Sequence, residues 1–213
     1  MPRRAKSNKE GEVERVYRSL KSWILDGRLR PGEFLSEVEL ARQCNTSRTP
    51  IREAFNLLSK ENWVCRIRHK GHMIPLISIR EVVEMYEYRK VLECFAAERA
   101  AASATPEDLI HLRSIIAIED QPGAEFEKYL RANEAFHTRL SEMTRNKYVL
   151  EQLKLALEHV HRLDVLSTQR DSQRILHGEI LRAIEAHQPA EAARAMAAHI
   201  DTSRDRMLKL FGT

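Results

Sequence analysis

The chain has 213 residues, with 35 Lys and Arg against 31 Asp and Glu, and is long enough for one or two domains with real hydrophobic cores. No apolar run approaches a membrane span and the N-terminus lacks a signal-peptide core, so we expect a soluble cytoplasmic protein without a membrane partner. The three cysteines have no metal or redox spacing, which favours buried thiols in a reducing compartment.

The charge is unevenly distributed along the chain. Residues 1–76 carry 16 basic and 9 acidic side chains, a net charge of +7, whereas residues 77–213 carry 19 and 22, a net charge of −3. This split suits a nucleic-acid-binding module joined to a different domain. Residues 1–10 resemble a disordered basic arm, which either touches phosphate or is a frayed terminus.

Residues 35–55 predict two short helices joined by a tight turn. Ser36 opens the first helix with a capping box, and Asn45 tolerates the left-handed conformation that ends it. Ser47 is the N-cap of the second helix, and Pro50 lies in its first turn, where a missing N–H costs little. This is the geometry of a helix-turn-helix, whose second helix enters the DNA major groove.

The second helix has an apolar face and a polar face when its residues are spaced at about 100°. The apolar arc contains Ile51, Ala54, Phe55 and Leu58. The opposite arc contains Arg48, Thr49, Arg52 and Asn56. Arg grips guanine in a bidentate fork, and hydroxyl side chains reach base edges or phosphates. The DNA contacts that we predict here come from Arg42, Ser47, Arg48, Thr49 and Arg52. The alternative is a solvated helix face with ordinary arginines.

Residues 63–74 alternate apolar and basic side chains before a glycine-containing turn, which predicts a β-hairpin. Asn62, just before it, takes the helix-ending role usually given to Gly. The hairpin would be a wing with Lys70, Gly71 and His72 at its tip. Glycine there lets the backbone approach phosphates or the minor groove closely.

These motifs together resemble the winged helix of the GntR superfamily of bacterial transcription regulators, over residues 11–76. The resemblance is carried by the run Ser47-Arg48-Thr49-Pro50-Ile51-Arg52-Glu53-Ala54, by Pro31-Gly32 and Leu40-Ala41 before it, and by Gly71 after it. It implies recognition of double-stranded operator DNA. Val38 departs from the pattern, because related proteins often carry a DNA-contacting Arg there.

Residues 77–213 predict an antiparallel bundle of six helices with short connections. Capping boxes or an early Pro mark several of the helix starts. The expected ranges are 79–102, 106–120, 124–143, 147–166, 169–186 and 189–210. The fold class is therefore mainly α, with an N-terminal winged helix-turn-helix and a C-terminal helical bundle.

Four side chains stand out in the predicted bundle. Asn133 and His137 are separated by four residues on one helix, so both can bind one ion. His177 and His199 are each expected in the middle of a later helix. Three imidazoles and an amide oxygen suit a divalent cation such as Zn²⁺, Ni²⁺ or Mn²⁺. From spacing alone, scattered helix histidines are the stronger alternative.

The second domain is similar to the effector domain of the FadR subfamily, through residues 84–93, 133–137, 177–184 and 193–200. That resemblance implies a metal held by Asp and three His, with a small carboxylic acid bound over it. Asn133 replaces the Asp here, so the metal affinity should fall. Arg89 is the candidate to grip an effector carboxylate, or else it pairs with Glu93. Arg162 is a second candidate to line the cavity.

We therefore expect a ligand-responsive transcription regulator that binds a pseudo-palindromic operator as a homodimer. The DNA-binding domain is predicted over residues 11–76, and the effector-binding and dimerisation domain over residues 77–213. The alternative is a metal-dependent enzyme fused to a DNA anchor. A base near the metal or an activated nucleophile lacks the required spacing, so we do not expect an enzyme.

Overall fold

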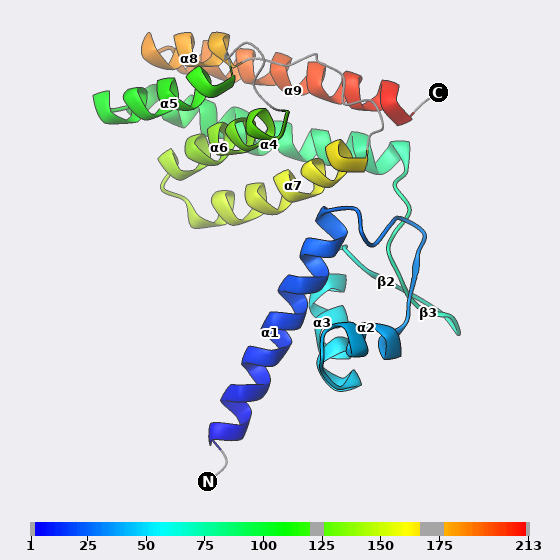
Figure 1. Cartoon of the computed structure of the whole chain (residues 1–213). Coiled ribbons are helices and arrows are strands. Elements are labelled where there is room, and N and C mark those ends of the chain that lie inside the picture. The colour runs from blue at the N-terminus through cyan, green and yellow to red at the C-terminus, as the bar shows by residue number, and fades with distance from the viewer. Residues whose placement is uncertain (1–2, 120–125, 167–176, 212–213) are drawn as a thin grey trace. The chain divides into compact units, whose positions relative to one another are not determined.

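A computed structural model describes residues 3–119, 126–166 and 177–211 (Figure 1). The chain divides into two compact units, residues 1–77 and 78–213, and each unit is considered by itself below. The expected chain break at residues 121–123 and the expected helix start at residue 169 lie outside the described residues. Within the described part, none of the helices combines the length and apolar character needed to cross a membrane.

The first unit is a helical domain with a small sheet. Its elements in chain order are α1 (Arg3–Leu25), β1 (Phe34–Leu35), α2 (Glu37–Gln43), α3 (Arg48–Lys60), β2 (Cys65–Ile67) and β3 (Gly71–Met73). The strands form an antiparallel sheet in the order β1-β3-β2. Apolar side chains of α1 pack on α3, with Leu20, Phe55 and Trp63 fully buried.

Helix α1 begins at Arg3, so the structure describes as helix most of the segment that we expected to be a disordered arm. The segment contains Arg, Ala, Lys and Glu, which have high helix propensity. Adding a residue to an existing helix is also easier than nucleating a new one, and the packed part of α1 supplies that nucleus.

The second unit is a bundle of α-helices, as the sequence predicted. They are α4 (Ile79–Ser103), α5 (Pro106–Glu119), α6 (Phe126–Met143), α7 (Lys147–Leu166), α8 (Gly178–Glu185) and α9 (Pro189–Phe211). Ser78 opens α4 with the expected capping box. Thr105 and Asp108 exchange hydrogen bonds at the start of α5.

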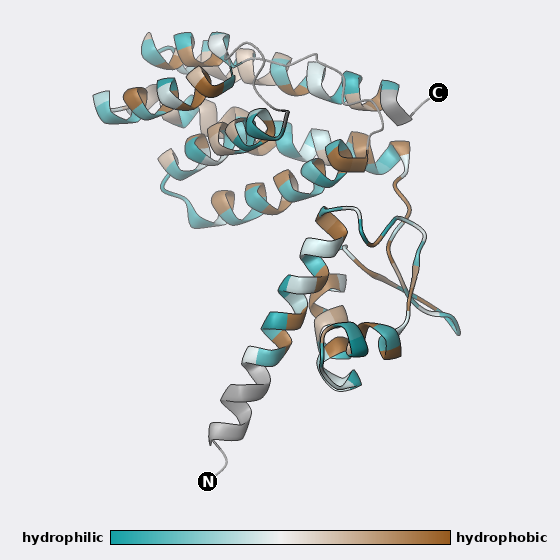
Figure 2. Ribbon diagram, in the orientation of Figure 1, coloured by the Kyte–Doolittle hydropathy of each residue, from teal (hydrophilic) through white to brown (hydrophobic). Residues whose placement is uncertain are grey.

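Apolar and polar residues form stripes along the bundle helices (Figure 2). Small buried residues on α4, among them Ala97 and Ala100, allow α9 to approach closely. Met196 and Ile200 of α9 are buried in the same core. Several charged and imidazole side chains interrupt these apolar stripes, and they gather around one small cavity.

Candidate DNA-binding face and metal-binding cavity

The turn between α2 and α3 has the predicted conformation. The Ser36 hydroxyl accepts a hydrogen bond from the backbone N–H of Glu39 at 3.3 Å, which caps α2. This is half of the predicted capping box, because the Glu39 side chain accepts from Arg42 and Gln43 instead. Asn45 lies at φ 49°, and Asn62, after α3, lies at φ 61°. Both asparagines therefore end their helices in the left-handed region, as expected. Ser47 is the N-cap residue of α3, and its hydroxyl makes no capping bond within the described residues.

The two faces of α3 are also confirmed. The apolar arc is buried, and the polar arc of Arg48, Thr49, Arg52 and Asn56 is exposed. The side chains of Arg48 and Arg52 are 56% and 57% exposed. Both guanidinium groups contact the same carboxylate, that of Glu37 on α2. Arg42, also on α2, is exposed and pairs with Glu39. The helix therefore presents arginines to solvent in a fixed arrangement.

The Glu37 carboxylate is more acidic than an ordinary glutamate. Its partial burial works to raise the pKa, but hydrogen bonds from Arg48 and Arg52 outweigh that effect and lower the pKa. The sequence analysis did not single out Glu37. It occupies the first position of α2, where a negative charge is also favoured by the helix dipole.

The wing is present, but its tip differs from the prediction. The turn lies at residues 68–70, with His69 at φ 63°, whereas Gly71 and His72 belong to strand β3. His72 is half-buried and its ring lies 4.6 Å from that of Phe55, so the expectation of His72 at the tip is wrong. Packing on the apolar core of α3 explains this position.

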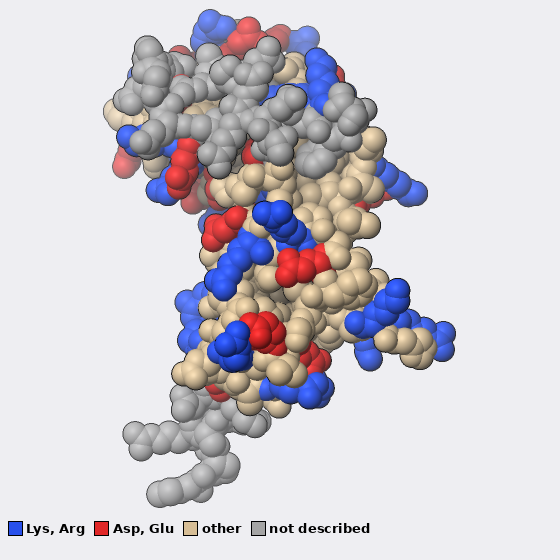
Figure 3. Space-filling view, turned by 45° about the vertical axis from the view of Figure 1, so that its right-hand side comes forward, with Lys and Arg blue, Asp and Glu red and all other residues tan. Residues whose placement is uncertain are grey.

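The hairpin exposes basic side chains, whereas His72 is half-buried. Figure 3 shows Lys and Arg gathered on a projection of the first unit, and Arg66, Arg68 and Lys70 are exposed there. Gly71 lies at φ 95°, a conformation that only glycine adopts without strain. The hairpin therefore carries positive charge on a backbone that a nucleic acid can approach closely.

In the second unit the three predicted histidines converge. His137, His177 and His199 are buried, and one nitrogen of each lies within 4.8 Å of the others. The Nε2 atoms of His137 and His177 are 3.1 Å apart. His177 was expected in the middle of a helix, but it is the N-cap residue of α8. From this position at the start of α8, the His177 side chain still reaches His137 and His199.

A buried carboxylate stands behind each of two histidines. Both oxygens of Glu119, on α5, lie within 2.9 Å of the Nδ1 atom of His177. A carboxylate oxygen of Glu93, on α4, contacts the Nδ1 atom of His137. A carboxylate on Nδ1 fixes the ring orientation and directs the Nε2 lone pair to the other side. Two lone pairs facing each other repel unless a proton or a cation lies between them.

The surroundings of His177 keep its imidazole neutral, which is the protonation state in which a histidine can bind a metal. Burial lowers its pKa well below the usual value, and the nearby imidazoles and Arg89 lower it further. For Glu93, burial works to raise the pKa, but Arg89 and His137 outweigh it and lower the pKa to about 2. A neutral imidazole such as that of His177 can donate a nitrogen lone pair to a divalent metal, and a carboxylate on the other ring nitrogen fixes its orientation.

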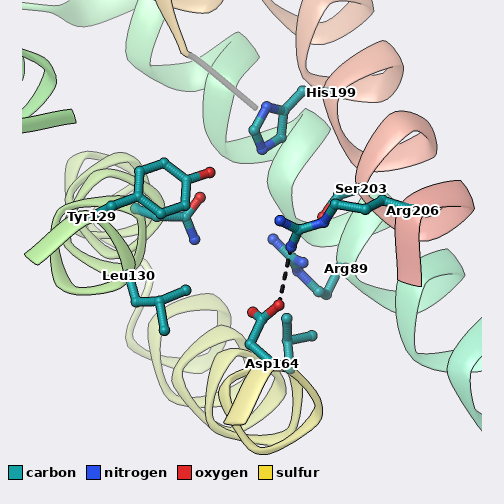
Figure 4. Close-up of a pocket in the computed structure, with 9 residues that line it drawn as sticks. Arg89, Tyr129, Leu130, Asp164, His199, Ser203 and Arg206 are labelled. Atoms are coloured by element: carbon teal, nitrogen blue, oxygen red, sulfur yellow. Dashed lines mark hydrogen bonds and ion pairs between the residues drawn. The ribbon is translucent and has the colours of Figure 1, made fainter. Parts of the chain in front are cut away.

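Next to the histidines lies a small polar cavity (Figure 4). Its lining residues come from α4, α6, α7 and α9 and are Arg89, Tyr129, Leu130, Asn133, Val160, Asp164, His199, Ser203 and Arg206. Arg206 donates to Asp164 at 3.0 Å, and the Nε of Arg89 donates to Glu93 at 2.7 Å. As closed here, the cavity has room for about one water molecule, so a larger ligand requires side chains to move.

The cavity bears on two predictions about arginines. Arg89 lines it and also pairs with Glu93, so the predicted ion pair is confirmed and the contact with an effector carboxylate stays a prediction. Arg162 is buried on α7 and is not among the cavity's lining residues, so its predicted place is wrong. Asn133 lines the cavity beside His199, on the same helix as His137.

Each of the two units matches a known protein family. Residues 12–74 match the family described as bacterial regulatory proteins, gntR family, and residues 84–202 match the FCD domain. The chain belongs to the GntR family. The FCD match spans the three histidines and most of the cavity lining, so the cluster lies within the FCD domain.

Two curated relatives are transcription regulators. The Nta operon transcriptional regulator of Aminobacter aminovorans is 30% identical over 185 residues, covering 85% of this chain and 87% of the relative. The transcriptional repressor RspR of Escherichia coli is 28% identical, covering 88% and 85%. The solved structure of E. coli McbR/YncC shares the fold, with a TM-score of 0.71, 21% identity and coverage of 94% of this chain and 98% of that chain. This GntR-family chain is therefore a regulator, and the enzyme alternative is wrong.

Sequence reasoning missed several residues of this site in the FCD domain. Glu119 follows Leu112, Ile115 and Ile116 on the buried stripe of α5. Asp164 continues the buried stripe of α7 in the same way. A carboxylate at a core position is costly unless it is paired, so each interrupted stripe was a signal that the helical period could have revealed.

Proposed function

We propose that this GntR-family regulator reads operator DNA through α3 and the wing. The observation that supports this most is the exposed arc of Arg48 and Arg52, held in place by Glu37. Arg42, Ser47 and Thr49 supply neighbouring polar contacts, and Lys70 and Gly71 of the hairpin approach the backbone of the DNA. His72 supports the wing from within.

The FCD domain holds a divalent cation in this proposal. His137, His177 and His199 are the ligands, and the amide oxygen of Asn133 joins them. The fit rests on the 3.1 Å approach of two Nε2 atoms, each ring being held by a carboxylate. When bound, the cation supplies positive charge that attracts a carboxylate ligand.

The effector in this proposal is a small carboxylic acid that enters the cavity. Arg89 and Arg206 offer guanidinium groups, whose planar fork matches a carboxylate. Both arginines already contact acidic side chains, so the effector competes with Glu93 and Asp164 for them. Because the closed cavity is small, effector binding rearranges the bundle, and that rearrangement changes DNA affinity.

The regulator acts as a homodimer on a pseudo-palindromic operator in the cytoplasm, and the FCD domains form the dimer. Tyr88, Val91 and Phe95 support this part, because these large side chains are 40%, 72% and 42% exposed on one face of α4. Two-fold symmetry then presents two α3 helices to successive major grooves.

The test of DNA reading starts with a duplex selected by the wild-type protein from a random-sequence library. Arg48→Ala and Arg52→Ala should each weaken binding of that duplex by ~1–3 kcal/mol. Binding of a scrambled duplex should change less, because that complex loses only the attraction of one positive charge, whereas the selected duplex also loses base contacts. Unchanged affinity for the selected duplex in both folded variants would contradict the assignment of α3.

The test of the metal is elemental analysis of the purified protein beside a His137→Ala/His177→Ala double variant. We expect a stoichiometric divalent metal in the wild-type protein and only background metal in the variant. Equal trace metal in both proteins would refute the cation site and leave the DNA-binding proposal intact.

A further inference from the structure

A carboxylate stands in the middle of the basic DNA-facing surface. Glu37 is an acid surrounded by arginines at the one place where a polyanion is expected to bind. From this juxtaposition we propose that Glu37 is a specificity-determining residue, which positions Arg48 and Arg52 for base contact and disfavours their use on phosphates. The inference rests on the proposed DNA-reading role of α3.

The positioning follows from the contacts of a single oxygen. Glu37 Oε2 accepts from Arg48 Nε at 3.2 Å, from Arg48 Nη2 at 2.8 Å and from Arg52 Nε at 2.8 Å. Glu37 belongs to α2 and the arginines to α3, so the contact spans the turn between the helices. The Glu37 side chain is only 20% exposed, which limits the positions that it can adopt. Both arginines are thereby fixed relative to each other.

Glu37 holds Arg52 through Nε, which leaves the terminal amines of that arginine in position for a base, and it holds Arg48 through Nε and one terminal amine. Arg52 contacts the carboxylate through Nε, whereas a fork with guanine O6 and N7 can be made by the two terminal Nη amines. An arginine that keeps its Nε bond can therefore contact a base at the same time. Because the side chain is already ordered, less conformational entropy is lost when it binds.

The negative charge acts against non-specific binding. To bind a phosphate, an arginine of α3 has to turn away from Glu37 toward the DNA backbone. The carboxylate then loses a partner while it faces a polyanion, which is electrostatically unfavourable. A base contact carries no such penalty, because the arginine stays on Glu37. Glu37 therefore makes phosphate contacts less favourable than base contacts, and this difference in binding free energy increases sequence specificity.

If Glu37 only stabilised α2, its replacement would affect DNA binding differently. A glutamate at the first position of a helix stabilises that helix through its dipole. In that case removal of the charge lowers the melting temperature and weakens the binding of every DNA sequence alike. The ratio of affinities for selected and scrambled duplexes therefore separates the two roles.

The experiment compares wild-type protein, Glu37→Gln and Glu37→Asp, with Glu53→Gln as the matched control. Glu53 is exposed on α3 next to Arg52, so its replacement removes the same charge as Glu37→Gln, but from the helix that carries both arginines. The dissociation constants are measured for a duplex selected by the wild-type protein and for a scrambled duplex, at several salt concentrations. Melting temperatures are recorded for all four proteins.

We expect Glu37→Gln to bind the scrambled duplex more tightly and to lower the specificity ratio by roughly tenfold. The salt dependence on the scrambled duplex should steepen by about 0.9 for each arginine that turns to phosphate. Glu37→Asp keeps the charge but has a shorter reach, so it should weaken the selected duplex without strengthening the scrambled one. Glu53→Gln should leave the ratio unchanged.

A specificity ratio for Glu37→Gln equal to that of Glu53→Gln would overturn the inference, as would equal losses on both duplexes. If Glu37→Gln fails to fold, the Glu37→Asp ratio decides, and an unchanged ratio there overturns the inference. The failure of the proposed function looks different, because Arg48→Ala and Arg52→Ala would then keep full affinity for the selected duplex.

Discussion

Replacing Glu119 with Gln tests the metal site through a residue that does not touch the metal. Glu119 is buried on α5, and both of its oxygens lie within 2.9 Å of His177 Nδ1. Glutamine keeps the volume and one acceptor but loses the charge that makes the imidazole a stronger donor. Losses of this kind typically weaken metal binding by ~10–100-fold, or about 1.4–2.7 kcal/mol.

The weaker zinc affinity of Glu119→Gln should reduce the rise in melting temperature that zinc causes. Zinc at ~100 times the wild-type Kd stabilises the fold by about 2.7 kcal/mol, and a tenfold weaker Kd reduces this to about 1.4 kcal/mol. For a chain of this size, the zinc-induced rise in Tm should then be smaller by about 3–5 °C. Without zinc the two proteins should melt at similar temperatures, because the amide oxygen still accepts from Nδ1.

The assay is a zinc titration followed by calorimetric melting, with Glu179→Gln as the control. Glu179 lies on α8, two residues after His177, and its side chain is 82% exposed. The control should retain the wild-type zinc affinity. If Glu119→Gln binds zinc as tightly as the control does, the carboxylate has no role in the metal site and the reasoning is refuted.

Three other substitutions have defined outcomes. Asn133→Asp adds an anionic ligand and should tighten metal binding, which a competition titration against a chelator measures; equal affinity would exclude Asn133 from the metal shell. Val38→Arg, at a side chain that is 63% exposed on α2, should raise DNA affinity and steepen the salt slope by about 0.9. An unchanged slope would mean that α2 does not reach the DNA. Val91→Glu places a charge on the exposed apolar face of α4 and should convert a dimer to a monomer in sedimentation; a dimer that persists would place the interface elsewhere.

The local signals in the DNA-binding unit predicted its structure well. Ser36, Asn45 and Ser47 determine where α2 and α3 begin and end, and these are short-range effects that a single sequence carries. His72 was misplaced because the end of a strand depends on what its side chain packs against. Contact with Phe55, 17 residues earlier, is a tertiary effect.

In the second unit the sequence and the resemblance identified the histidines but not their supports. The helix with His177 was expected to continue through that residue, whereas in the structure α8 begins directly after it. Glu93, Glu119 and Asp164 lie on the buried stripes of their helices. The partners His137, His177 and Arg206 come from other segments of the chain, and helix pairing is not contained in the period of any one segment.

In the proposed function a carboxylic acid in the FCD cavity controls DNA binding, and a titration of DNA with and without such an acid examines this link. A library of carboxylic acids is screened for those that raise the Tm of the zinc-loaded protein. The Kd for the selected duplex is then measured with and without the acid that raises Tm most. We expect the Kd to change by ~5-fold or more in wild-type protein, in either direction, and by less in Arg89→Gln. An acid that stabilises the protein yet leaves the DNA affinity unchanged, or that acts equally on Arg89→Gln, would contradict this expectation.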